Sequence, residues 1–407
     1  MSTPEPDKIP SPSGYRSLPT RVTRLILSLA FEGFGVGYLT VYITAYLPEA
    51  GFSSSSVGLL LGVFGLSLVA AAFPLGILSD RKGRKNLFLI GLFTLPVEFL
   101  VFALTSNLSY LLIATVFVGV SEAATLATWN AIIADQTTPE NRDKAFSTAF
   151  IVNLGSIGIG SAIPLAFPAI QNISGLGVDL VHRAFMAGVS LAVLASPILA
   201  SLLLRDYFEL AKNEARQKKR GHLRTLLKFS FLNGLLGFGT GLIIPLIPTW
   251  FFLKFGVQDT YTGPLLALAS LTVAMSAAIS PRLSRRYGLV KSIVMVQGVA
   301  TVFMISLGFA PIPLLAAGFF VARAGFMYMG NPLADSYLMG IIEAQERGLA
   351  SAVNSVMWEL PQSGSTILGG VILGSGSYTS PFLLAALFYA VSISLFYSLF
   401  RNLKPRT

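Results

Sequence analysis

The sequence predicts an all-α membrane protein, with twelve transmembrane helices arranged in two related bundles of six. Three observations predict this fold class. First, 53% of the 407 residues are hydrophobic and only 12% are charged, whereas about 25% are charged in an ordinary soluble domain. Second, the hydrophobic residues form blocks that reach the roughly 20 residues needed to cross a bilayer. Third, the second half of the chain repeats features of the first half at a constant offset.

The hydrophobic blocks follow one another along the chain with short connections. A polar segment, 1–23, precedes the first block and has no hydrophobic stretch of its own, so a cleavable signal peptide is not expected. A charged linker, 205–223, separates an N-terminal bundle, 24–204, from a C-terminal bundle, 224–401, and a polar tail, 402–407, follows. The twelve predicted spans are 24–48, 55–79, 87–105, 108–134, 145–170, 181–204, 224–252, 260–280, 291–310, 313–340, 348–374 and 379–400.

The positive charges predict the orientation in the membrane. If both termini are cytoplasmic, 26 of the 29 Lys and Arg residues fall on the cytoplasmic side, as the positive-inside rule requires. The expected location is therefore the cell membrane, with both termini in the cytoplasm. The basic residues are spread over several loops and are not interleaved with aromatic residues, so they indicate contact with lipid headgroups and not with nucleic acid.

Several classes of chemistry are not expected. The chain contains no cysteine, which excludes disulfides and thiolate metal sites. Its two histidines, His182 and His222, lie at span margins without metal-ligand spacing and are expected to be solvated. No glycine-rich phosphate loop is present. We therefore expect neither an enzyme nor a bound cofactor or metal.

An offset of 205 residues relates the two halves. Parallel repeats of six spans are a known transporter architecture, in which the solute site lies between the halves near the middle of the membrane. The pairs at this offset include Gly51 and Gly256, Gly58 and Gly263, Arg81 and Arg286, Gly83 and Gly288, and Arg142 and Arg347.

The loop between the second and third spans, 76–85, reads Gly-Ile-Leu-Ser-Asp-Arg-Lys-Gly-Arg-Lys. It resembles the signature loop of the major facilitator superfamily, G-x-L-x-D-R-x-G-R-K. The resemblance implies a twelve-helix transporter that works by alternating access, with this loop as a gate on the cytoplasmic side. A second copy of this loop lies at 281–288, at the offset of 205 residues. It has Arg285 where the first copy has Asp80, so gating is assigned to the first copy only. The residues that match the gate motif are Gly76, Asp80, Arg81, Gly83 and Arg84.

The fifth span resembles the glycine-rich motif of proton-linked exporters in the same superfamily. The matching residues are Gly155, Gly158, Gly160 and Pro164, but the Gly-Pro core of that motif is not intact. Small residues at this spacing also serve close helix packing. Both interpretations remain open from the sequence.

Ionisable residues inside spans are costly, and each is therefore a functional candidate. We expect Glu32, Glu122, Arg323 and Glu359 to bind substrate or couple protons. Glu98 is expected to make a helix-helix contact, and Asp335 to be a gate or packing residue.

Glu122 and Arg323 both lie near the middle of their spans. In the superfamily that the sequence resembles, spans 1, 4, 7 and 10 line the central cavity, so the two charges are expected to face each other across the halves. Glu122, Thr125 and Trp129 follow the spacing i, i+3, i+7 and share one helix face. The remaining expected cavity residues are Tyr38, Tyr42, Asn130, Asn153, Asn233, Tyr328 and Trp358.

The resulting hypothesis is proton-coupled export of small amphipathic or drug-like molecules by a monomer. The alternative is a proton-linked importer, or a facilitator, of organic anions or other polar nutrients, with Arg323 as the anion anchor. A third hypothesis is transport of lysolipids, because Gly119-Val-Ser-Glu122-Ala is similar to the fourth-span pattern of Spinster-type transporters. The arginine that those proteins have a turn or two earlier is missing here.

Overall fold

The computed structural model describes residues 18–207, 223–277, 279–342 and 347–401. Within these ranges the regular structure is entirely helical, as the sequence predicts. Away from its ends a helix satisfies its backbone hydrogen bonds internally, which a chain in hydrocarbon requires. The first half contains α1 (Thr20–Ser28), α2 (Ala30–Val41), η2 (Tyr42–Tyr46), α3 (Leu47–Glu49), α4 (Ser54–Lys82), α5 (Arg84–Leu104), α6 (Leu108–Asp135), α7 (Pro139–Ala162), η3 (Ile163–Ala166), α8 (Phe167–Ser174), α9 (Val178–Val193) and α10 (Ala195–Leu203). The second half contains α11 (Leu223–Gly241), η4 (Ile244–Leu246), α12 (Ile247–Phe255), α13 (Asp259–Ala277), α14 (Ser280–Tyr287), α15 (Leu289–Gly308), α16 (Pro313–Ile341), α17 (Arg347–Gly374) and α18 (Ser380–Phe400).

A helix stands at each of the twelve predicted span positions. Among the described residues, ten helical segments are long and apolar enough to cross a membrane, or up to eleven if α13 and α14, which meet at 45°, form one span. α17 occupies the position of the predicted eleventh span and has 28 residues, but it is not among these segments. Its Glu359, Gln362 and serines make it more polar than the others. Most of the predicted linker, 205–223, lies outside the described residues.

The structure keeps the offset of 205 residues between the halves. Gly83 and Gly288 occupy the same place in each half and have positive φ angles of 97° and 79°. A residue with a Cβ atom rarely adopts that conformation, which explains why both turns use glycine. Helices begin 205 residues apart at Ser54 and Asp259, at Arg84 and Leu289, and at Leu108 and Pro313.

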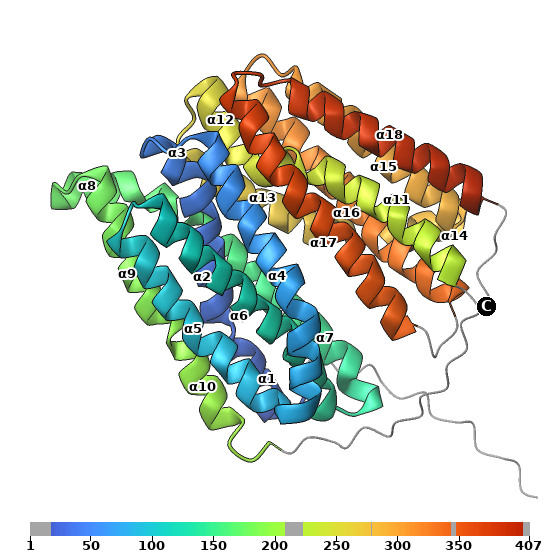
Figure 1. Cartoon of the computed structure of the whole chain (residues 1–407), viewed down its shortest axis with the longest axis horizontal. Helices are drawn as coiled ribbons and strands as arrows, with labels where there is room; N and C mark the ends of the chain where they lie inside the picture. The colour runs from blue at the N-terminus through green and yellow to red at the C-terminus, as the bar shows by residue number, and fades with distance from the viewer. Residues whose placement is uncertain (1–17, 208–222, 278, 343–346, 402–407) are drawn as a thin grey trace, which may run out of the picture.

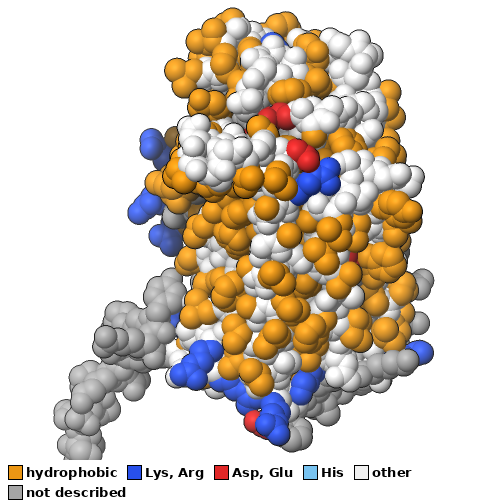
Figure 2. All heavy atoms as spheres, turned by 90° about the vertical axis from the view of Figure 1, so that its left-hand side faces the viewer, with side chains coloured by type: hydrophobic (Ala, Val, Ile, Leu, Met, Phe, Trp, Pro, Cys, Tyr) orange, Lys and Arg blue, Asp and Glu red, His pale blue; other side chains and the backbone are white. Residues whose placement is uncertain are grey.

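The two halves meet along two pairs of helices. α4 packs on α17, and α7 packs on α13 (Figure 1). We call the end of the molecule with α3 and α12 the closed end. The opposite end, where α1 and α5 begin and α18 ends, is called the basic end. On the face drawn in Figure 2 the wall is mostly hydrophobic, as expected for a surface in contact with lipid, and Lys and Arg side chains gather along its lower edge.

Small residues allow the halves to approach each other closely toward the closed end. A Cβ atom on Gly58 of α4 would lie 2.8 Å from the carbonyl oxygen of Thr366 in α17. A Cβ atom on Gly263 of α13 would lie 2.3 Å from the carbonyl oxygen of Ser161 in α7. Toward the basic end of α4, a Cβ atom on Gly76 would meet nothing within 4 Å. α4 is therefore in tight contact with α17 only toward the closed end.

Polar interactions between the halves follow the same pattern. Every hydrogen bond or ion pair that joins described residues of the two halves lies at the closed end. Ser54 Oγ donates to the Gly370 carbonyl (3.0 Å), Thr249 Oγ1 donates to the Thr44 carbonyl (2.6 Å), the Asp259 amide donates to the Glu49 carboxylate, and His182 Nε2 lies 3.4 Å from Asp259 Oδ2. The conformation is therefore one in which the closed end is sealed between the halves.

Candidate functional site

The candidate site is a cavity of about 710 Å³ in the N-terminal half. α1, α2, α6 and α7 form its walls, and Ala274 of α13 is contributed by the other half. Two carboxyl groups from different helices line it, Glu32 of α2 and Glu122 of α6. The other predicted site residues that line it are Trp129, Asn130 and Asn153.

The two carboxylates dominate the electrostatics of the cavity. Glu32 is 6% exposed and interacts electrostatically with Glu122. Among the described residues, no Lys or Arg forms an ion pair with either of them. Two negative charges in a site of low dielectric repel each other. A proton or an organic cation in this cavity relieves that repulsion.

One face of α6 presents three different contacts to the cavity. Glu122, Thr125 and Trp129 all line it, as their spacing predicts. The Thr125 hydroxyl is buried and has no hydrogen-bond partner among the described residues. The Trp129 ring stacks on Phe88, with ring centroids 5.7 Å apart. A solute therefore meets a carboxylate, an available hydroxyl and a fixed aromatic ring on one helix.

Arg323 belongs to a separate cluster in the C-terminal half. It is 1% exposed, and its Nη2 donates a hydrogen bond to Tyr389 Oη at 2.8 Å. The Tyr389 hydroxyl also shares a hydrogen bond of 2.7 Å with the Thr240 hydroxyl. Tyr328 interacts electrostatically with both Arg323 and Glu359. In this conformation Arg323 forms no ion pair with a described carboxylate, and its Nε has no hydrogen-bond partner among the residues that the structure describes.

Tyr38 and Tyr42 lie outside the cavity that contains Glu32. Both are buried in the N-terminal half. Tyr38 Oη lies 3.2 Å from His182 Nδ1 in α9, and Tyr42 Oη donates to the Phe102 carbonyl in α5 at 3.0 Å. These contacts attach the first span to its neighbours, so the two tyrosines serve packing in this conformation.

Asn233 and Trp358 also lie apart from the two carboxylates. Asn233 lines a small void of about 20 Å³ within the C-terminal half. Trp358 packs against the main hydrophobic core, and its backbone lies against Gly237 of α11. Neither residue shares a described cavity with Glu122.

His182 corrects an expectation from the sequence, because it is 1% exposed and not solvated. Its ring stacks on Tyr46, with centroids 3.8 Å apart, and approaches Asp259 from the other half. Tyr46 Oη in turn donates to Asp179 Oδ1 at 2.5 Å. Its partner Asp259 is 77 residues away along the chain, so no local signal predicted the contact. His222 lies outside the described residues.

The fifth-span glycines divide between two environments. A Cβ atom on Gly160 would lie 2.0 Å from the Phe34 carbonyl oxygen, so Gly160 serves close packing of α7 on α2. Gly155 and Gly158 would meet nothing within 4 Å and instead line an open groove between α7 and α13. Packing therefore explains Gly160 but not the other two.

The loop with the gate motif is anchored by a buried ion pair. Arg84 Nη1 lies 2.6 Å from Asp135 Oδ2, and the two side chains are 9% and 11% exposed. Tyr207, beyond the end of α10, donates to the same carboxylate at 2.5 Å, and burial together with Asp135 raises the pKa of the Tyr207 phenol. Arg81 is exposed, and the side chain of Asp80 lies outside the described part of the chain. Arg84 therefore connects the start of α5 to the end of α6.

Replacing Arg84 by alanine is expected to destabilise the protein. It would leave Asp135 buried without its cation, which typically costs about 3–5 kcal/mol. Thermal unfolding in detergent, followed by scanning fluorimetry, measures the effect. The matched control is Arg81→Ala in the same motif, which removes an exposed charge and is expected to change stability by less than about 0.5 kcal/mol. Equal losses in both variants would contradict an anchoring role for Arg84.

Comparison with protein families gives one match that covers most of the chain. The family model described as Major Facilitator Superfamily matches residues 25–234 and 229–407.

Similar proteins include drug-resistance proteins of bacteria. Multidrug resistance protein 1 of Bacillus subtilis is 25% identical over 391 residues, which cover 92% of this chain and 95% of that protein. Quinolone resistance protein NorA of Staphylococcus aureus (strain COL) is 32% identical over 175 residues, 42% of each chain. Among solved structures, a bacterial homologue of the human lysosomal transporter Spinster, in an inward-facing and occupied conformation, matches with a TM-score of 0.74 and 16% identity, and the match covers 96% of this chain and 98% of that one.

Proposed function

This chain belongs to the Major Facilitator Superfamily, and we propose that within this family it exports small amphipathic organic cations in exchange for protons. Membership makes the chain a multi-pass membrane transporter of small molecules and not an enzyme. The similarity to multidrug and quinolone resistance proteins supports drug-like cargo.

The observation on which the proposal rests is the pair of carboxylates in one cavity. Glu32 and Glu122 share a desolvated space without a described cationic partner. Such a pair favours the binding of positive charge, whether as protons or as an organic cation. If the site holds either protons or the organic cation, but not both at once, the inward movement of protons is coupled to the outward movement of the cation. The Trp129 ring adds a surface for the apolar and aromatic part of the cargo.

The orientation follows from the charge distribution. With the basic end in the cytoplasm, the cavity beside Glu122 receives solutes from the inside while the closed end seals the outside. Rocking of one half on the other would open the seam between α4 and α17 and release the cargo outward. A single chain contains both halves, so we expect the monomer to be the working unit.

The competing function is transport of organic anions. Arg323 supports it, because this buried guanidinium has an Nε without a described partner. Its Nη2, however, is already engaged in a hydrogen bond to Tyr389 Oη within the C-terminal half. The anion hypothesis requires Arg323 for binding, whereas the cation hypothesis requires Glu122.

Electrometry on proteoliposomes separates the two functions. Cationic amphiphiles, sugars and organic anions are applied in turn under an imposed pH gradient. The proposal expects currents with cationic amphiphiles that reverse when the pH gradient reverses. Currents with anions only, or currents that are insensitive to pH, would reject proton-coupled cation export.

A further inference from the structure

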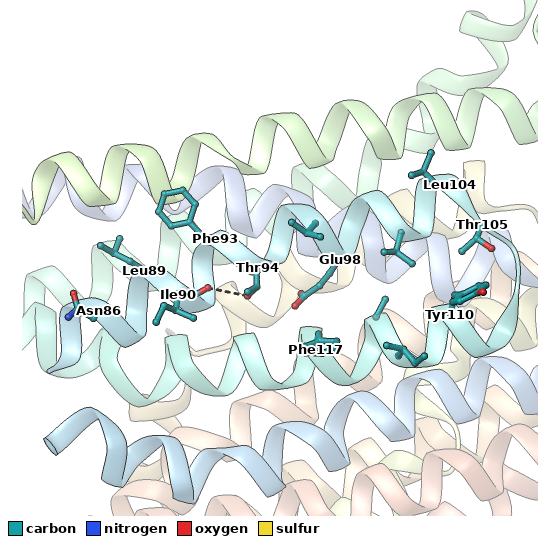
Figure 3. A pocket seen from close by; sticks show the side chains of 14 residues that line it. Asn86, Leu89, Ile90, Phe93, Thr94, Glu98, Leu104, Thr105, Tyr110 and Phe117 are labelled. Atoms are coloured by element: carbon teal, nitrogen blue, oxygen red, sulfur yellow. Dashed lines mark hydrogen bonds between the residues drawn. The ribbon is translucent and has the colours of Figure 1, made fainter. Parts of the chain in front are cut away.

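A second apolar depression lies on the outer surface of the N-terminal half. It is a groove of about 960 Å³ between α5 and α6, lined mainly by hydrophobic side chains (Figure 3). Several of these are widely exposed, including Val97 (63%), Tyr110 (60%) and Phe117 (56%). Because both helices cross the membrane, the groove faces lipid. Lipid tails alone would need no polar group there.

The groove nevertheless contains a carboxyl group. Glu98 of α5 is among its lining residues and is 5% exposed. Oε1 accepts a hydrogen bond from Ser121 Oγ of α6 at 2.9 Å, and Ser121 Oγ shares a hydrogen bond of 2.5 Å with Thr94 Oγ1. The first contact confirms that Glu98 joins two helices, as the sequence predicts. The second oxygen, Oε2, has no partner among the described residues.

The scaffold itself does not require an acid at this place. With the offset of 205 residues, Glu98 corresponds to Phe303 of α15, whose helix begins at the equivalent residue. The related helix pair in the C-terminal half therefore forms without a carboxylate. Among the described residues, no Lys or Arg forms an ion pair with Glu98. A carboxyl group half satisfied in hydrocarbon costs several kcal/mol, so it calls for a ligand.

We propose that this groove is a separate binding site for lipophilic organic cations that are dissolved in the bilayer. Such cations have delocalised or shielded charge and partition into the hydrocarbon layer. The hydrophobic walls would hold the apolar groups, and Glu98 would supply the opposite charge. The groove and the cavity are lined by different residues of α6, Tyr110 to Phe117 in the groove and Glu122 to Asn130 in the cavity, and they have no lining residue in common. The site takes the same class of ligand as the proposed function but does not need transport to occur.

Equilibrium binding of radiolabelled tetraphenylphosphonium to the protein in lipid nanodiscs tests the proposal, with empty nanodiscs as the blank. The background is the double variant Glu32→Gln/Glu122→Gln, which removes the charges of the cavity. We expect this background to keep one saturable site per chain. Adding Glu98→Gln is expected to weaken binding by about tenfold or more, because an opposite charge is lost from a low-dielectric site. Neutral triphenylphosphine oxide is expected not to compete.

A second variant tests the location without touching the carboxylate. Val97→Trp fills the groove from a lipid-facing position, so folding should be preserved. Its matched control is Val302→Trp, which lies at the offset of 205 in α15 and is 62% exposed. In the wild-type background, Val97→Trp is expected to reduce the number of bound cations from two to one, and Val302→Trp to leave it at two.

The outcomes separate this site from the proposed function. Residual binding in the double variant that does not respond to Glu98→Gln, or equal effects of the two tryptophan variants, would overturn the groove site. An absence of saturable binding in the double variant Glu32→Gln/Glu122→Gln would also overturn the groove site. Failure of cation transport with intact Glu98-dependent binding would reject the proposed function and leave this site in place.

Discussion

Replacing Glu122 by glutamine is expected to abolish the uphill export of tetraphenylphosphonium from proteoliposomes under a pH gradient. Glutamine keeps the shape of the side chain but can neither release a proton nor attract a cation. Loss of a charged partner in a buried site typically costs about 3–5 kcal/mol, which corresponds to at least a hundredfold at about 1.4 kcal/mol per factor of ten. The initial rate of export at fixed internal cation concentration measures this loss.

The matched control for Glu122→Gln is Asp335→Asn. Asp335 lies in α16, the counterpart of α6, and does not line the cavity with the two carboxylates. Neutralising Asp335 in this way should leave at least half of the wild-type export rate. Since Glu122→Gln removes repulsion with Glu32, its thermal stability should equal or exceed that of the wild type. A variant that folds and still exports at the wild-type rate would exclude Glu122 from coupling.

Replacing Gly263 by valine is expected to open the closed end. A Cβ atom at this position would lie 2.3 Å from the Ser161 carbonyl oxygen, whereas ordinary contacts are about 3.5–4.0 Å. Overpacking of this kind costs about 1–3 kcal/mol, enough to shift the balance between the two conformations by about 5- to 150-fold. The strain is relieved only when α13 and α7 separate. The variant should therefore populate the outward-open state and transport slowly.

Spin labels measure this shift, because the chain has no native cysteine. Cysteines introduced at the exposed positions Ser174 and Ser375 place one label on each half. Pulsed electron paramagnetic resonance should show a longer mean distance between the two labels in Gly263→Val than in the wild type. The control Gly158→Val adds the same side chain at a glycine whose Cβ would meet nothing within 4 Å, and its distance should stay as in the wild type. Unchanged distances in both variants would refute the closed-end seam.

The fold was predictable because membrane spans are encoded in local composition. Length and hydropathy placed helices at all twelve positions, and the offset of 205 reproduced the helix starts of three pairs, such as Arg84 and Leu289. The spacing of Glu122, Thr125 and Trp129 predicted one shared face, which the cavity contains. Each of these predictions depends on contacts within one helix or on repetition along the chain.

Predictions that depended on the rotation of one helix against another were less informative. The first span is apolar over most of its surface, so its sequence does not indicate which face Tyr38 and Tyr42 occupy. In the structure Tyr38 contacts α9 and Tyr42 contacts α5. His182 was expected in solvent because it lies at the margin of a predicted span. It is buried against Tyr46 of the first span and Asp259 of the other half, partners that only the assembled fold provides.

The presence of two acids in one cavity has a consequence for the energy source. If Glu32 and Glu122 each return one proton inward for every monovalent cation sent out, one net positive charge enters per cycle. Membrane voltage then adds about 2.3 kcal/mol per 100 mV to the driving force. Export would continue at an external pH equal to the internal pH as long as the voltage persists. With Glu32→Gln, one carboxylate remains, and the exchange would become electrically silent and insensitive to voltage.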